Sequence, residues 1–304
     1  MAVAALAGGV GGAKLLVGLQ RVLGSDLTAI VNTGDDATIY GSHVSPDVDI
    51  VAYWLAGIAD TKRGWGIAGD TFEMVDMLRE LGAEAWFSLG DRDGATCRYR
   101  TMMLAAGATL TQATDAIRRA LEVAASILPM SDDAVRTKLT TDDARTLDFQ
   151  TYFVKERCEP EIAEIRFAGV DSAHPGPGVL RTIRHAERVV ICPSNPLLSI
   201  APILALPGVR DELARHPHVV AVTPIIQGAA LKGPADRLLA RLGHDVSASG
   251  VAALYADFCD RFVVDERDAS EVGKVEAAGV GPVPADTIMP THDAAERLAR
   301  VILD

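Results

Sequence analysis

A glycine-rich turn close to the N-terminus is the first stretch whose residues could do chemistry. The letters GGVGGAK at residues 8–14 directly follow the apolar run Val3–Ala7, a pattern typical of a strand that leads into a helix. Successive N–H groups in such a turn can hold a phosphate, although a tight packing turn is the plain alternative. The spelling matches neither G-x-x-x-x-G-K-[ST] nor G-x-G-x-x-G, so it leaves the nucleotide open. The predicted anion contacts are Gly8, Gly9, Gly11, Gly12 and Lys14.

Acidic side chains follow in two further stretches. The first is NTGDD at residues 32–36, where an acid could bind a ribose diol, Mg²⁺ or a substrate hydroxyl, or could cap a helix. The second is SPDVD at residues 45–49, an ordinary helix start in which Asp47 and Asp49 face different directions. Two carboxylates beside a phosphate repel it unless a cation bridges them, so a Mg²⁺ site that includes Asp35 is chemically sensible.

Three more polar stretches contain candidate binding residues. The stretch SLGDRD at residues 88–93 has alternating charges, which indicate either a surface ion pair or an arginine, Arg92, that binds an anionic substrate. In CPSNP two prolines fix the backbone around Ser194 and Asn195. Helix capping explains one of these two side chains, and the rigid pair suggests ligand recognition. Lys232 is a weaker candidate cation for a phosphate.

Composition and charge exclude several classes of protein. Apolar residues make up 49% of the 304 residues, which is enough for a sizeable core. The net charge of −12 argues against binding to nucleic acid or to an anionic membrane, but local amides and cations still allow an anionic small ligand. No apolar stretch approaches the ~20 residues of a membrane span. The four cysteines form no CxxC pair, so a reduced, cytoplasmic protein is the simplest interpretation.

Short apolar runs that alternate with helical patterns must position these residues. The alternation predicts an α/β fold with a Rossmann-like, doubly wound, mostly parallel sheet, whose ligands bind at the carboxyl ends of the strands. Residues 1–75 and 170–304 are expected to form the core, and residues 75–170 a smaller helical and β insertion. The predicted strands are Val3–Ala7, Leu27–Asn32, Arg188–Cys192, His218–Thr223, Arg261–Asp265 and Asp286–Met289, and the main predicted helices are Ala13–Leu23, Thr111–Leu128 and Asp293–Leu303.

Nine stretches, in this order, together resemble one family: GGVGGAKLLVGL, VNTGDDATIYG, SPDVDIVAYWLAG, GWGIAGDTF, WFSLGDRDGATCRYRT, LPMSDD, FQTYFV, PSNPLLSIAPILALPGVR and KGPADRLL. They are similar to the 2-phospho-L-lactate transferase family (CofD/FbiA). The resemblance implies a Mg²⁺-dependent, homodimeric enzyme of coenzyme F(420) biosynthesis, with a Rossmann-like core and an insertion that helps to enclose the deazaflavin. Such an enzyme moves a phospholactyl-type group from a guanosine-diphosphate-linked donor to the deazaflavin alcohol Fo and releases GMP. The sequence does not distinguish 2-phospholactate, phosphoenolpyruvate and 3-phosphoglycerate as the three-carbon group.

The resemblance also implies roles for individual residues. The donor's diphosphate would lie on the glycine turn beside Lys14, and Ser194 and Asn195 would lie on the guanosine side. Ser88 stands where relatives usually have Arg or Lys, so Arg92 is the candidate to replace that contact. The expected deazaflavin contacts are Asn32, Thr33, Asp49, Ser88 and Arg92, the expected catalytic residues are Asp47 and Asp49, and the expected metal ligands are Asp35 and Asp49.

Two other functions fit parts of the sequence. A non-catalytic nucleotide-sugar-binding regulator of the gluconeogenesis-factor type has a similar glycine turn, and it would need neither the GDRD stretch nor a deazaflavin. An NAD(P)-dependent oxidoreductase is suggested only by the glycine turn and the acid after the second strand. The missing final glycine of the dinucleotide fingerprint weighs against this last function.

Overall fold

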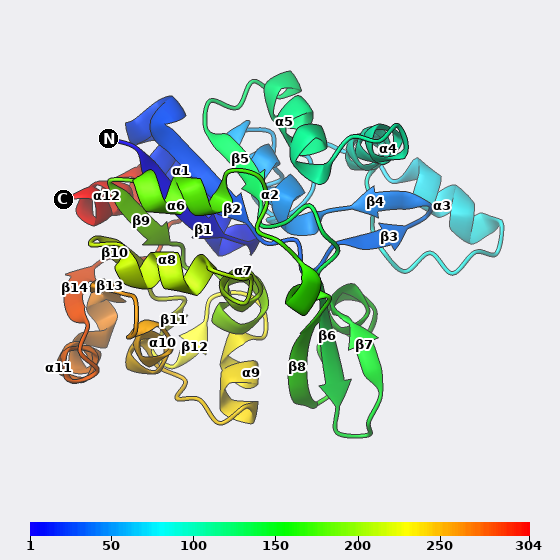
Figure 1. The fold of residues 1–304 in the computed structure, drawn as a ribbon. Coiled ribbons are helices and arrows are strands. Elements are labelled where there is room, and N and C mark those ends of the chain that lie inside the picture. The colour runs from blue at the N-terminus through cyan, green and yellow to red at the C-terminus, as the bar shows by residue number, and fades with distance from the viewer.

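A seven-stranded parallel sheet forms the centre of the computed structural model, which describes all residues from 1 to 304 (Figure 1). Its strands are β1 (Val3–Ala7), β2 (Leu27–Val31), β5 (Ser126–Pro129), β9 (Arg188–Ile191), β10 (Val219–Val222), β13 (Arg261–Asp265) and β14 (Gly281–Ala285). The spatial order is β14-β13-β10-β9-β1-β2-β5, and every neighbouring pair is parallel. The order reverses between β1 and β9, which is where open sheets of this kind bind their ligands. The predicted Rossmann-like, doubly wound sheet is confirmed.

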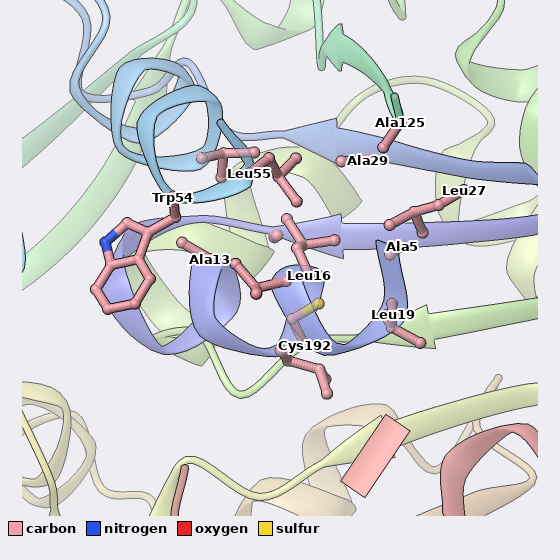
Figure 2. Packing of buried hydrophobic residues seen from close by; sticks show 14 of the residues in the cluster. Ala5, Ala13, Leu16, Leu19, Leu27, Ala29, Trp54, Leu55, Ala125 and Cys192 are labelled. Carbon is pink, nitrogen blue, oxygen red and sulfur yellow. The ribbon is translucent and has the colours of Figure 1, made fainter. Parts of the chain in front are cut away.

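Helices cover both faces of this sheet because its strands are apolar on both sides. Successive side chains of a strand point to opposite faces, so Ala5 and Ala7 of β1 belong to one core while Ala4 and Leu6 belong to the other. Figure 2 shows part of the first core, which includes Leu16 and Leu19 of α1 and the small side chains Ala5 and Ala29 of the strands. Its helices are α1 (Gly9–Leu23), α2 (Pro46–Leu55) and α12 (His292–Leu303). The helices of the second core are α6 (Val179–His185), α7 (Ala201–Leu204), α8 (Val209–Arg215), α9 (Ala235–Arg241), α10 (Ala248–Tyr255) and α11 (Val272–Ala277).

Helix α1 crosses α12 at very short range. A Cβ atom on Gly18 of α1 would lie 2.2 Å from the backbone oxygen of Ala295 on α12. Only glycine fits this crossing, so the glycine at this position is explained by packing alone. The close contact fixes the direction of the helix that begins at the glycine turn.

Two smaller units lie on the far side of the molecule from the two chain termini (Figure 1). One consists of the antiparallel hairpin β3 (Ala37–Ile39) and β4 (Ser42–Val44) with α3 (Glu73–Glu80) and α4 (Asp91–Ala105), around a small core that includes Val75 and Leu89. The other is a three-stranded antiparallel sheet of β6 (Arg136–Thr141), β7 (Thr146–Asp148) and β8 (Ile162–Ala168). The remaining elements are α5 (Leu110–Ala120), the hairpin β11 (Ile225–Ile226) and β12 (Ala229–Ala230), and helical turns at Gly24–Asp26, Thr151–Lys155, Val170–Ser172, Pro196–Ile200 and Glu266–Glu271.

Three boundary predictions need correction. The predicted helix Thr111–Leu128 ends early, because α5 stops at Ala120, Glu122 takes a positive φ of 56° and the following residues form β5. Since β5 joins the central sheet, the expected insertion over residues 75–170 is interrupted by a core strand. The last strand is β14, not Asp286–Met289; it contains two prolines, which an edge strand tolerates. None of the helices combines the length and hydropathy that a membrane span requires.

Candidate active site

A cavity of about 830 Å³ opens at the carboxyl end of the sheet, beside the loops that follow β1 and β9. This is the place at which the strand order reverses, so the fold itself predicts a ligand site there. Eleven of the candidate residues from the sequence line it: Gly8, Gly9, Gly11, Lys14, Asp35, Asp47, Asp49, Ser88, Ser194, Asn195 and Lys232. Four others, Gly12, Asn32, Thr33 and Arg92, are not part of the lining.

The glycine turn is shaped by the segments packed against it. Gly9 has a φ of +63°, which favours glycine, and a Cβ on Gly8 would lie 2.3 Å from Oδ2 of Asp47. A Cβ on Gly11 would lie 2.4 Å from the carbonyl oxygen of Pro193, in the loop after β9. Gly12 meets Ser194 Oγ in the same way, at 2.5 Å, so Gly12 serves the packing of the turn. The glycines are therefore needed for close packing of the turn, and the same turn is also open to the cavity.

Only part of the N-terminus of α1 is open to a ligand. The N–H of Gly8 donates to Ser194 Oγ at 3.0 Å, and the N–H of Gly9 donates to Asp47 Oδ1 at 2.7 Å. Val10 and Gly11 come next, in the first turn of the helix, where no helical acceptor precedes them, and neither N–H has a partner elsewhere in the protein. Both residues line the cavity, so these two amides are the donors that an anion would meet at the positive end of α1.

Asp35 and Asp47 form a buried acidic pair beside this turn. The Asn32 side-chain amide donates to both carboxylates, to Asp35 Oδ1 and, at 3.0 Å, to Asp47 Oδ2. Burial raises the pKa of Asp47 to about 6, against the opposing effect of the Asn32 and Gly9 donors. Burial and then the charge of Asp47 raise the pKa of Asp35 well above its usual range. No cationic side chain makes an ion pair with either group, so a cation is what this pair lacks.

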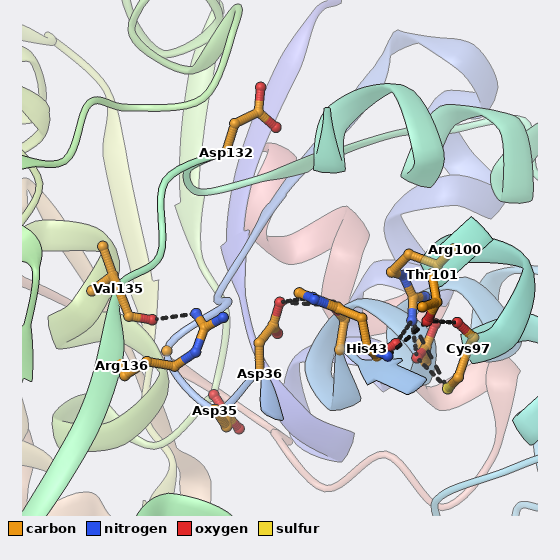
Figure 3. A network of polar contacts seen from close by, with 12 residues as sticks. Asp35, Asp36, His43, Cys97, Arg100, Thr101, Asp132, Val135 and Arg136 are labelled. Atoms are coloured by element: carbon orange, nitrogen blue, oxygen red, sulfur yellow. Dashed lines mark hydrogen bonds and ion pairs between the residues drawn. The ribbon is translucent and has the colours of Figure 1, made fainter. Parts of the chain in front are cut away.

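Asp49 lies two residues further along α2 and has quite different partners. Both of its carboxylate oxygens accept from the guanidinium of Arg100, Oδ1 from Nη2 and Oδ2 from Nη1 at 3.1 Å. Arg100 lies on α4 and is fully buried; its Nη1 also donates to the carbonyl oxygen of His43 at 3.1 Å (Figure 3). Burial raises the pKa of Asp49, and the Arg100 charge opposes that rise. The expected metal ligands Asp35 and Asp49 therefore belong to two separate clusters, one without a cation and one with an arginine.

Three further residues complete the Asp49 cluster. Oxygen or sulfur atoms of Asp49, Asp93 and Cys97 lie within 4.8 Å of one another. Tyr53 donates its hydroxyl to Asp93 Oδ1 at 2.8 Å, and burial, followed by the Asp49 charge, raises the pKa of Asp93 to about 7. Nothing in the sequence singled out Tyr53. Asp93 and Arg100 belong to the charged stretch that begins at Ser88, for which a surface ion pair was one interpretation, but Arg100 is fully buried. The three-residue spacing of Cys97 and Arg100, which puts both on one helix face, is a further local signal for this cluster.

Cations gather at the glycine-turn end of the cavity. Lys14 lies with its Nζ 5.9 Å from the centre of the Trp54 ring, and burial and then Lys232 lower the pKa of Lys14. Lys232 donates to the carbonyl oxygen of Arg63 at 3.2 Å, and the Arg63 guanidinium lies 5.0 Å from the Trp65 ring centre. Neither lysine makes an ion pair with a carboxylate, so two like charges face each other where an anion would lie.

Aromatic side chains form another part of the wall. Phe149 and Phe153 stack with ring centres 5.3 Å apart and planes 15° apart, and Phe87 lines the same cavity next to Ser88. Phe153 is 40% exposed although it stacks on Phe149, so the pair presents an apolar surface to the cavity. Arg92 points elsewhere, since its guanidinium makes only a 3.4 Å contact with the carbonyl oxygen of Ala68. Ser88 thus lies where the sequence analysis expected a substrate contact, and Arg92 does not lie in the lining.

Comparisons with known proteins agree along the whole chain. The model of the family described as 2-phospho-L-lactate transferase CofD matches residues 3–303. A 2-phospho-L-lactate transferase of Methanosarcina mazei is 41% identical over 297 residues, which cover 97% of this chain and 97% of that protein. A phosphoenolpyruvate transferase of Kitasatospora aureofaciens is 41% identical over 311 residues, which cover 100% of this chain and 97% of that protein. Among solved structures, a Bacillus halodurans member of the upf0052 family is similar in fold, with a TM-score of 0.68 at 17% identity over 99% of this chain and 98% of that one.

Proposed function

Because the chain belongs to the 2-phospho-L-lactate transferase (CofD) family, we propose that it transfers a phospholactyl-type group from a guanosine-diphosphate-linked donor to the deazaflavin alcohol Fo. GMP is the second product, and the reaction belongs to coenzyme F(420) biosynthesis. The relatives named 2-phospho-L-lactate transferase and phosphoenolpyruvate transferase support a transferase of this type. They leave the three-carbon group open, because their names give two different ones.

One observation carries the proposal: a single cavity combines an anion-binding end with an aromatic wall. Free N–H groups of Val10 and Gly11 and the cations Lys14 and Lys232 suit the diphosphate of the donor. The stacked rings of Phe149 and Phe153 suit a flat heteroaromatic acceptor. A site that binds two such different substrates at once is what a group-transfer reaction needs.

The side chains suggest how the transfer proceeds. The terminal ribityl hydroxyl of Fo attacks the phosphorus distal to guanosine, a new O–P bond forms, and the bond from that phosphorus to the GMP oxygen breaks in line. Phosphoryl-type transfers have loose transition states, so positioning and charge neutralisation matter more than a strong base. Asp49, whose two oxygens are held by the Arg100 guanidinium, accepts the hydrogen bond of the hydroxyl and takes its proton late in the step.

The acidic pair Asp35–Asp47 fits a divalent cation. Both side chains are buried and line the cavity beside the open amides of α1, and neither is neutralised by an arginine or lysine. Carboxylate oxygens together with phosphate oxygens are the ligands that Mg²⁺ prefers. Bound there, Mg²⁺ would offset charge on the bridging and leaving oxygens. The Asp47 carboxylate also accepts from the Gly9 N–H, so its charge would repel a diphosphate at this turn unless a cation lay between them.

Family membership favours this transferase over the two alternatives. A gluconeogenesis-factor-type regulator would not need the aromatic wall, and an oxidoreductase would not need the acidic pair at the phosphate-binding turn. The Bacillus halodurans structure supports the fold alone, because it shares only 17% identity with this chain.

Fluorescence of the deazaflavin provides the direct test. Fo should bind the protein in the presence of GDP and Mg²⁺, and mass spectrometry should detect an Fo phosphodiester with one of the three candidate donors. An Asp49→Asn variant, which keeps an oxygen acceptor for the buried Arg100, should lose most of its transfer activity, whereas the matched control Asp171→Asn, an exposed acid outside the cavity lining, should keep it. Absence of Fo binding by the wild-type protein, with or without GDP, would contradict the proposal.

A further inference from the structure

Arg100 is the most unusual buried residue of the molecule. It lies in the middle of α4, its side chain is 0% exposed, and it is the largest fully buried side chain in the protein. A guanidinium is very costly to remove from water unless its donors are paired with an anion. α4 has exposed faces on which an arginine would incur no such cost. Its burial therefore indicates a specific partner and not a general packing role.

That partner is a carboxylate from the other side of the cluster. The planar fork of Arg100 meets Asp49 of α2 in two parallel bonds. The carbonyl oxygen of His43 in β4 accepts a further one at 3.1 Å (Figure 3). One guanidinium thereby joins α4 to both β4 and α2. A two-pronged arginine pair fixes the plane and the rotation of a carboxylate, which a point charge does not do.

The contrast with Asp47 indicates the purpose of this arrangement. Asp47 accepts from one backbone N–H and one amide and has no cation, which suits a ligand for a metal ion. Asp49 has its charge balanced and both oxygens oriented, yet it still lines the cavity. A carboxylate oxygen that accepts one hydrogen bond retains capacity for a second. Asp49 is thus equipped to receive a hydroxyl from one fixed direction.

We propose that Arg100 is a positioning residue that holds the Asp49 carboxylate in the orientation in which it accepts the attacking hydroxyl of the acceptor. The inference rests on the proposed function, in which Asp49 contacts the deazaflavin alcohol. Arg100 itself is not in the cavity lining and acts only through Asp49. A displacement of the reacting groups by about 1 Å is enough to reduce a rate by about 10²-fold.

The sharpest variant is Arg100→Lys, because it keeps the charge and removes the fork. Steady-state kinetics should show kcat/KM for the deazaflavin reduced by about 10- to 100-fold. GDP affinity, measured by calorimetry, should change by less than about twofold, because the proposed nucleotide site lies beside Asp35 and Asp47 and not beside Arg100. Arg98→Met is the matched control: this arginine is exposed on the same helix and lines no part of the cavity, so its kinetics should match wild type.

A double-mutant cycle separates positioning from folding. Asp49→Asn combined with Arg100→Met removes both charges, so neither is left buried without a partner. If Arg100 acts through Asp49, the double variant should have the same kcat/KM as Asp49→Asn, within about twofold. A further tenfold loss in the double variant, or unchanged kinetics in Arg100→Lys, would overturn the inference. If wild type itself fails to use the deazaflavin alcohol, the proposed function fails first, and the two failures are distinguishable.

Discussion

Two carboxylates on the first turn of α2 lie in opposite electrostatic surroundings. Asp47 faces the glycine turn and shares the Asn32 amide with Asp35, without any cation nearby in an ion pair. Asp49 faces α4 and is neutralised by the buried Arg100. In the proposed function, the five letters SPDVD serve two separate tasks: Asp47 would bind a cation at the phosphate end, and Asp49 would orient a hydroxyl at the acceptor end.

The difference shows that the spacing of two acids does not determine their chemistry. Helical periodicity alone predicts that residues two apart point in different directions. What each acid then does depends on the segment it meets, and those segments come from other parts of the chain.

The largest effect is expected for Asp47→Asn. The variant keeps an acceptor for the Gly9 N–H but loses the charge that would hold Mg²⁺, so transfer should fall by about 10³-fold or more. Mg²⁺ should raise the melting temperature of the wild type and of Asp49→Asn, but not that of Asp47→Asn. If Mg²⁺ raised the melting temperature of Asp47→Asn by the same amount, the cation would bind elsewhere, and the proposed difference between Asp47 and Asp49 would be wrong.

A smaller effect is expected on the pH dependence of stability, through the Asp93 carboxyl of the Asp49 cluster. Its pKa is raised to about 7 in the folded protein, whereas an unfolded aspartate titrates near ~3.9. The folded state therefore holds this proton after the unfolded state has lost it, so stability falls as pH rises from about 4 to about 7 and stays low above that range.

Asp93→Asn removes this penalty and keeps the acceptor for Tyr53. Urea unfolding at pH 8 should show Asp93→Asn more stable than wild type by up to about 4 kcal/mol, with a much smaller difference at pH 4.5. An equal difference at the two pH values would mean that Asp93 is ionised in the folded protein at both. Asp93 would then resemble Asp49, whose charge is balanced by Arg100, and not Asp35 and Asp47, which have no cationic partner.

The smallest effect is expected for Lys14→Met. Lys14 makes no ion pair and adds to two backbone amides that already point at the anion site, so GDP should bind about tenfold more weakly, or about 1.4 kcal/mol. Lys62→Met, which alters an exposed lysine outside the cavity lining, is the control. Unchanged GDP affinity in Lys14→Met would assign the phosphate to the Val10 and Gly11 amides alone.

Local features of the fold and site could be predicted, and features made by distant partners could not. The turn after β1 was recognisable because strand, glycines and helix are contiguous in the sequence. The pairing of Asp49 with Arg100 spans 51 residues and leaves almost no trace in either stretch. The strand β5 was hidden for a related reason, since four residues after a helix look like its continuation until β2 provides their hydrogen bonds.

The close crossing of α1 and α12 has a consequence for how the protein folds. An ion pair between Arg21 of α1 and Asp293 of α12 spans 272 residues, so the direction of α1 depends on a segment that lies far away in the sequence. Contacts of such long sequence separation form slowly, because a long loop must close before they are made. The glycine turn at the start of α1 should therefore be fixed late in refolding, and until then the apolar face of α1 remains exposed.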